Sequence, residues 1–96
     1  MNTKLLLTVD WITPAEDRDA SHAVRSIGGR SGDLKWEHSQ EQAISYIERG
    51  LFEYFVREHS QNLKLKVATT MEGRKYLKVD AQPGVPVSDL DLPVHN

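Results

Sequence analysis

The chain has 96 residues, 39% of them hydrophobic and 27% charged, with a formal net charge of -2; these values are typical of one globular domain and exclude an intrinsically disordered chain. The weak negative charge excludes a global attraction to nucleic acid or to an anionic membrane, so any such binding has to be local. The absence of cysteine excludes disulfides and thiolate metal ligands, and it is typical of a reducing cytoplasm.

The apolar run Leu5-Leu6-Leu7 is too short for the core of a signal peptide or for a membrane span. We therefore expect a soluble cytoplasmic protein that does not bind membranes. We also expect residues 1–96 to form a single domain, with a core over about residues 3–81 and an extended tail over residues 82–96, where prolines interrupt regular structure.

The first third of the chain predicts two strands and a loop. Residues 3–13 alternate between two faces and predict a first strand. An acidic, turn-rich connection at residues 14–19 precedes a second strand at residues 21–27, which we expect to return antiparallel to the first. The glycine-rich segment Gly28–Asp33 predicts a loop that leads to Trp36, whose side chain we expect to cover the start of a helix.

The middle of the chain predicts one amphipathic helix, Ser39–Arg49. Ser39-Gln40-Glu41-Gln42 has the form of a capping box, in which Ser39 and Gln42 each accept a hydrogen bond from the backbone N–H of the other. Gly50 favours the left-handed conformation that ends a helix. The apolar stripe of this helix, which needs a sheet beneath it, consists of Ala43, Ile44, Ile47 and Leu51.

Three segments after the helix alternate apolar and polar residues with period two and predict strands: Phe52–Glu58, Leu63–Thr70 and Arg74–Asp80. Because residues opposite each other in antiparallel strands share a face, the pattern predicts the loops His59–Asn62 and Met71–Gly73, with Gly73 left-handed. The predicted buried rows are Tyr54, Val67 and Leu77 in one and Val56, Leu65 and Val79 in the other.

Together these elements predict an α+β fold. We expect an antiparallel sheet of about five strands with one helix packed on one face, in chain order ββαβββ. The residues that we expect to be mostly buried are Ile44, Ile47, Tyr54, Val56, Leu65, Val67 and Leu77.

The order of several short motifs resembles a known family. These motifs are Ile27-Gly28-Gly29, Trp36, Ile47-Glu48-Arg49-Gly50, Glu53-Tyr54-Phe55-Val56, Gly73-Arg74-Lys75-Tyr76-Leu77-Lys78 and Leu92-Pro93. Over residues 21–93 the chain resembles domain-of-unknown-function family 3892, which consists of small uncharacterised prokaryotic proteins with one helix. The resemblance implies a prokaryotic source and a similar fold, and it implies no activity.

The predicted loop Gly28–Gly32 has backbone amides suited to an anion, with Arg30 beside them. It lacks the Gly-Lys-Ser/Thr ending of a P-loop and does not open onto a helix with dinucleotide spacing. We therefore favour an ordinary connecting loop and no cofactor. An enzyme site, if one exists, is expected in a groove near this loop, Trp36 and the tail, with Arg30, Asp33 and His38 as polar groups.

The other titratable side chains form no recognisable catalytic or metal-binding motif. The scattered histidines are His22, His38, His59 and His95, and none is paired at ligand spacing. Ser39 beside His38 suggests a nucleophile and a base, but Ser39 already serves as the helix cap and lies in no Gly-x-Ser-x-Gly elbow. The acidic pairs, which lie in exposed segments, are Asp17/Asp19 and Asp89/Asp91. We expect no catalytic, cofactor-binding or metal-binding residues.

The solvent face of the predicted sheet carries aromatic and basic side chains together. The candidate partner-binding residues on this face are Phe55, Arg57, Lys64, Lys66, Tyr76 and Lys78, accompanied by Glu53, Ala68 and Asp80. The simplest interpretation is a wet face whose lysines keep the protein soluble. Rings that stack on bases beside cations that bind phosphates are also typical of sheet-based RNA binders, and aromatic anchors flanked by charges are typical of protein interfaces.

We favour a non-catalytic binding module that recognises a protein partner or a second copy of itself. The alternative is a weak nucleic-acid binder that uses the basic and aromatic face. A small enzyme is the third alternative, because no set of residues rises above coincidence.

Overall fold

The computed structural model describes residues 4–15, 23–58, 60–81, 84–90 and 92–94. In chain order the elements are β1 (Leu5–Val9), β2 (Trp11–Pro14), β3 (Val24–Ser31), β4 (Leu34–Ser39), α1 (Gln40–Glu48), β5 (Phe52–Glu58), β6 (Gln61–Thr69), β7 (Lys75–Val79) and the short 3-10 helix η1 (Val87–Asp89). Within the described residues, no helix has both the length and the apolar character needed to span a membrane.

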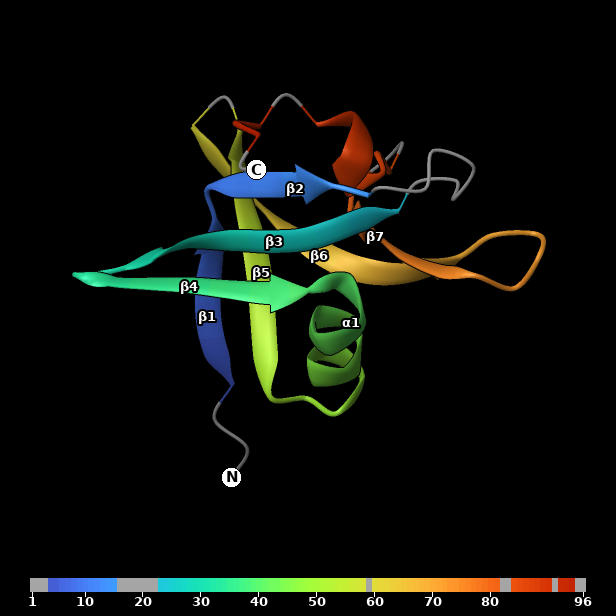
Figure 1. Cartoon of the computed structure of the whole chain (residues 1–96), viewed down its shortest axis with the longest axis horizontal. Coiled ribbons are helices and arrows are strands. Elements are labelled where there is room, and N and C mark those ends of the chain that lie inside the picture. The colour runs from blue at the N-terminus through green and yellow to red at the C-terminus, as the bar shows by residue number, and fades with distance from the viewer. Residues whose placement is uncertain (1–3, 16–22, 59, 82–83, 91, 95–96) are drawn as a thin grey trace.

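The strands form two sheets. A four-stranded sheet has the order β1-β5-β6-β7, with β1 parallel to β5, and a three-stranded sheet has the order β2-β3-β4. Figure 1 shows the three-stranded sheet crossing in front of β1 and β5, and α1 contacts strands of both sheets. The predicted α+β class is confirmed. The prediction of one antiparallel sheet of about five strands is wrong, because β4 is an additional strand and the predicted first strand divides between the sheets.

This division occurs because the chain bends at Asp10. The backbone N–H of Asp10 donates to the carbonyl oxygen of Gly28 at 2.8 Å, and its Oδ2 accepts from the N–H of Arg30 at 3.0 Å. In one straight strand Val9 and Ile12 would face opposite sides. The bend lets both side chains reach the core, where they are only 2% and 5% exposed.

The glycine pair lies inside β3 and not in a loop. A side chain on Gly28 would meet the ring of Trp11, and a side chain on Gly29 would meet the backbone carbonyl of Thr8. Glycine is needed at Gly28 because the Trp11 ring occupies the space of a side chain, and at Gly29 because the backbone of β1 approaches closely. Neither glycine is there because the chain turns.

The second strand extends further than predicted, and β4 follows it. β3 is antiparallel to β2, as predicted, but it continues through the glycine pair to Ser31. The chain reverses at Gly32-Asp33, where Gly32 has a φ of +62° and Ser31 lies opposite Leu34. The predicted loop at residues 28–33 therefore shrinks to this turn, and residues 21–22 of the predicted strand lie outside the described residues.

The helix α1 has its predicted start and end. Ser39 Oγ accepts from the N–H of Gln42 at 3.1 Å, and Gln42 Oε1 accepts from the N–H of Ser39 at 3.0 Å, which completes the capping box. Gly50 follows with a φ of +73°. Of the predicted stripe, Ala43 and Ile44 are buried, Ile47 is half-buried and Leu51 is exposed.

The β6–β7 hairpin has the predicted register. Val67 lies opposite Leu77, and the N–H of Thr70 donates to the carbonyl oxygen of Arg74 at 2.8 Å. Gly73 has a φ of +89°, as its place in the turn predicts.

The β5–β6 hairpin is shifted by two residues from the predicted register. Val56 lies opposite Leu63 and not opposite Leu65. The turn is shorter than the predicted loop His59–Asn62, whose His59 lies outside the described residues, and Ser60 is left-handed with a φ of +66°. The predicted rows across β5 and β6 are therefore wrong. The faces are right, because a shift by two keeps every side chain on its own side of the sheet.

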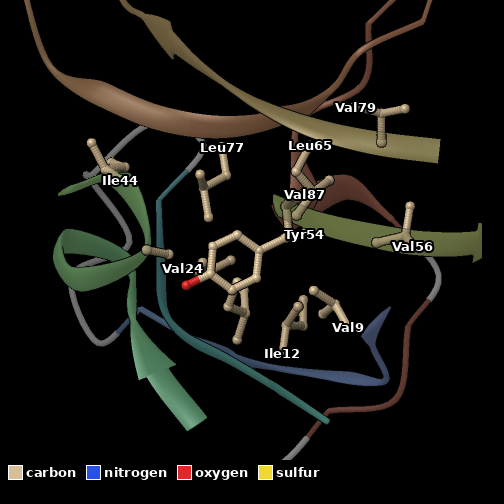
Figure 2. Packing of buried hydrophobic residues seen from close by; sticks show 12 residues of the cluster. Val9, Ile12, Val24, Ile44, Tyr54, Val56, Leu65, Leu77, Val79 and Val87 are labelled. Atoms are coloured by element: carbon tan, nitrogen blue, oxygen red, sulfur yellow. The ribbon is translucent and has the colours of Figure 1, made fainter. Parts of the chain in front are cut away.

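The core fills the space between the two sheets, with the ring of Tyr54 in the middle of the cluster (Figure 2). Its buried hydrophobic residues are Val9, Ile12, Val24, Ile27, Ala43, Ile44, Tyr54, Val56, Leu65, Leu77, Val79 and Val87. The residues predicted to be buried follow this outcome in five cases, and the two exceptions, Ile47 and Val67, are half-buried.

The tail returns to the domain and completes the core. Val87 in η1 is 0% exposed. Pro86 forms a bridge with Lys78 at the edge of β7, and the N–H of Ile12 in β2 donates to the carbonyl oxygen of Pro93 at 3.0 Å. The tail therefore contacts an outer strand of each sheet.

We expect Gly29→Ala to lower the free energy of unfolding by about 1–3 kcal/mol, as overpacking does. The physical reason is that the carbonyl of Thr8 belongs to the backbone and cannot rotate away from an added methyl group. Urea unfolding curves measure the effect. Ser31→Ala, at the exposed end of the same strand, is the control and should change stability by less than about 0.5 kcal/mol. Equal midpoints for both variants would contradict the close crossing.

Candidate functional site

Side chains on the four-stranded sheet alternate between a face that packs on the core and a face that points away from it. We call the second the open face. Its residues are Leu6 and Thr8 on β1, Glu53, Phe55 and Arg57 on β5, Lys64, Lys66 and Ala68 on β6, and Tyr76 and Lys78 on β7.

All six side chains predicted as a partner-binding surface lie on the open face. Phe55 lies opposite Lys64, Lys66 lies opposite Lys78, and Tyr76 lies opposite Ala68; Arg57 follows Phe55 on the same side of β5. The cations Arg57, Lys64 and Lys66 are exposed, whereas Phe55, Tyr76 and Lys78 are half-buried. Because period-two alternation decides the face, the shift of the β5–β6 register leaves this grouping intact.

Two carboxylates engage two of these cations. Glu53 Oε1 lies 3.3 Å from Lys4 Nζ and 3.4 Å from Lys64 Nζ, and Asp80 Oδ1 lies 3.3 Å from Lys66 Nζ. The hydrogen bond from Lys4, followed by the charge of Lys64, holds the pKa of Glu53 below its usual value against the opposing effect of desolvation. Exposed ion pairs add little stability, so their main effect is to reduce the positive charge of the open face.

A second site of chemical interest lies on the inner side, where β4, α1 and β5 meet. Five rings form an aromatic cluster, with centroids of neighbouring rings 5.0–6.1 Å apart: Trp36, His38, Tyr46, Phe52 and Tyr54. Nδ1 of His38 lies 2.7 Å from the hydroxyl of Tyr54. The Tyr54 hydroxyl is thereby satisfied inside the core, where an isolated polar group would be costly.

Burial favours the neutral form of both members of this hydrogen bond. Desolvation lowers the pKa of His38, and desolvation, followed by the nearby Tyr46, raises the pKa of Tyr54. When both groups are neutral, one of them donates the hydrogen in this bond and the other accepts it. This arrangement suits a structural role, because neither group is held in the charged form.

The residues proposed for an enzyme groove are not brought together. Arg30 lies opposite Lys35 near the turn of the β3–β4 hairpin, Asp33 lies in that turn, and His38 lies opposite Ile27 near the other end. At about 3.3 Å per residue, five residues of extended strand separate Asp33 from His38 by roughly 16 Å.

The remaining candidates for catalysis or metal binding do not converge within the described part of the chain. No group of three or more His, Cys, Asp or Glu side chains is placed there to hold a metal ion. Ser39 Oγ caps α1. The candidates that lie outside the described residues are His22, His59, His95, Asp17, Asp19 and Asp91.

A groove of about 400 Å³ lies between α1 and the start of β7. Lys75 Nζ contacts Glu48 Oε2 at 2.7 Å across it, and Gln40 Nε2 donates to the carbonyl oxygen of Lys75 at 3.5 Å. These contacts join the helix to the sheet edge, and we assign no ligand to the groove.

The inward position of His38 could have been predicted from the sequence if residues 34–38 had been recognised as a strand. In Leu34-Lys35-Trp36-Glu37-His38 the apolar, aromatic and imidazole side chains alternate with charged ones, which is typical of a half-buried strand. Recognition of that strand would place Trp36 and His38 on one face, toward the core.

Comparisons with family models, with curated proteins and with solved structures found no match to this chain. The resemblance to domain-of-unknown-function family 3892 therefore stays a prediction.

We expect the stability of the protein to fall as the pH drops below about 6.5, the usual pKa of histidine, because His38 binds its proton more weakly in the folded state than in the unfolded state. The comparison is between the wild-type protein and His38→Gln, which keeps a neutral hydrogen-bonding group for the Tyr54 hydroxyl. Unfolding free energies measured in urea from about pH 7.5 to about pH 5.5 should decrease more for the wild-type protein. Parallel profiles for both proteins would contradict this role of His38.

Proposed function

We propose that this protein is a non-catalytic binding module that recognises another protein through the open face. The observation that carries the proposal is the mixture of groups on that face: Leu6 is 63% exposed, Phe55 and Tyr76 are half-buried, and charged side chains surround them. Aromatic side chains and arginine are enriched in protein interfaces, where they act as anchors within a polar rim.

The charges of the open face favour a protein over a nucleic acid. A phosphate backbone would have to compete with Glu53 for Lys64 and with Asp80 for Lys66. The formal net charge of -2 adds a small repulsion. A protein surface with its own carboxylates and apolar side chains can bind Arg57 and Phe55 while these ion pairs persist at the rim.

Weak binding of single-stranded nucleic acid is the second candidate. It is supported by the position of Phe55 directly opposite Lys64 on the adjacent strand, because a ring that stacks on a base next to a cation that binds a phosphate is a recurrent arrangement on sheets.

For either candidate function, we propose that the protein acts in the cytoplasm of a prokaryote. Its lack of cysteine and the family resemblance support this location.

The test uses the full chain as bait to capture partner proteins. The affinity of each identified partner is then measured after its purification. We expect Phe55→Ala to weaken the binding of a true partner at least tenfold, about 1.4 kcal/mol. Combined Lys64→Gln and Lys66→Gln should change mainly the association rate and its salt dependence. Met71→Ala, in the exposed β6–β7 turn, is the control and should leave affinity unchanged.

Two results would contradict the proposal for the open face. One is a partner whose affinity is the same for the wild-type protein and for Phe55→Ala, with both shown by melting curves to be folded. The other is binding of mixed-sequence RNA or DNA that falls steeply with salt and is abolished by combined Lys66→Glu and Lys78→Glu, which would favour the nucleic-acid alternative.

A further inference from the structure

The strand β4 is an outer strand of the three-stranded sheet, with β3 along one side and no described strand paired along the other (Figure 1). The opposite outer strand, β2, is different, because Ile12 forms a bridge with Val94 in the tail. An outer strand of a sheet can pair with a strand of another molecule.

The hairpin geometry decides which backbone groups of β4 point outward. In a hairpin with a two-residue turn, the residues that flank the turn exchange hydrogen bonds, and such pairs alternate with pairs that do not. Ser31 and Leu34 flank the turn Gly32-Asp33. The residues of β4 that point their N–H and C=O toward β3 are therefore Leu34, Trp36 and His38.

Lys35 and Glu37 consequently point their N–H and C=O away from β3, to the outer edge. The neighbouring strand agrees with this assignment. Arg30 lies opposite Lys35, and its N–H donates to Asp10 on the far side of β3 at 3.0 Å. Both Lys35 and Glu37 are exposed.

The charges of these two residues select one register for pairing with a second copy about a two-fold axis. The outward groups match when Lys35 lies opposite Lys35, when Glu37 lies opposite Glu37, or when Lys35 lies opposite Glu37. Like charges directly opposite each other are destabilising, and opposite charges are stabilising. Only the third register places opposite charges together, and symmetry makes it do so twice, with Trp36 at the axis.

Leu34 gives an independent reason for contact along this edge. Its side chain is 74% exposed although it belongs to a strand. In the third register Leu34 lies opposite His38 of the second copy. The contact would remove exposed apolar surface from water.

We propose that two copies of this chain associate through β4, antiparallel, with Lys35 of each copy opposite Glu37 of the other. The two three-stranded sheets then form one continuous sheet across the two-fold axis. This surface is separate from the open face, which belongs to the other sheet.

Sedimentation equilibrium of the full chain over a concentration series tests the proposal. We expect the apparent mass to rise with concentration toward twice 10.9 kDa. Lys35→Glu and Glu37→Lys should each weaken this association at least tenfold, because each sets like charges against each other at both pairs. Arg74→Glu, which makes the same charge change as Lys35→Glu in the distant β6–β7 turn, should associate as the wild-type protein does.

A mixture of the two single variants separates an interface effect from damage to the fold. In a heterodimer of Lys35→Glu with Glu37→Lys, opposite charges again face each other at both pairs. We expect the mixture to recover dimers that neither variant forms alone at the same total concentration. The amide of Lys35 should also exchange hydrogen at least tenfold more slowly as the wild-type protein dimerises.

Three results would overturn the proposal. The first is a wild-type protein that stays at 10.9 kDa throughout the series, in which case the charge of Lys35 serves only to prevent other strands from pairing with β4. The second is a dimer that Lys35→Glu does not weaken, which places the contact on another surface. The third is a mixture of the two variants that stays monomeric although melting curves show both to be folded.

Discussion

The close crossing between the start of the chain and β3 is the constraint on which the two-sheet arrangement depends. Asp10 bends the chain and joins its own N–H to the carbonyl of Gly28, while Gly28 and Gly29 leave room for the ring of Trp11 and the carbonyl of Thr8. Because β1 belongs to one sheet and β2 to the other, this crossing sets how the sheets face each other. It thereby defines the space that the core cluster around Tyr54 fills (Figure 2).

The sequence predicted those features that are decided by neighbours along the chain. The capping box at Ser39 and the left-handed Gly50 and Gly73 depend on contacts within a few residues, and all three are confirmed. The faces of β5, β6 and β7 follow from alternation alone, so the grouping of Phe55 with the cations of the open face was predictable too. The register of β5 with β6 was not predictable, because a shift by two leaves the alternation unchanged. In addition, the left-handed residue of the turn is Ser60 and not a glycine, so the sequence does not mark the position of the turn.

The features that were not predictable depend on residues far apart in the chain. Glycines usually mark turns, and nothing local distinguishes Gly28 and Gly29 from that case; the approach of Thr8 and Trp11 becomes visible only when the strands are placed together. The same error concealed β4, since a loop assigned to residues 28–33 leaves little chain for a strand before the helix. Because β4 was not predicted, the hydrogen bond between His38 and Tyr54 could not be predicted either.

The two proposed surfaces are compatible, because they belong to different sheets. Pairing through β4 would extend the three-stranded sheet and leave the open face of the four-stranded sheet uncovered. A dimer would then carry two open faces related by the two-fold axis. Each open face offers few large apolar or aromatic side chains for burial by a partner, so binding through a single open face is expected to be weak. Two linked contacts raise the apparent affinity for a partner that presents its binding surface more than once, through effective concentration and with no new contact. The dependence of binding on the charges of Lys35 and Glu37, which do not belong to the sheet of the open face, would be the signature of this coupling.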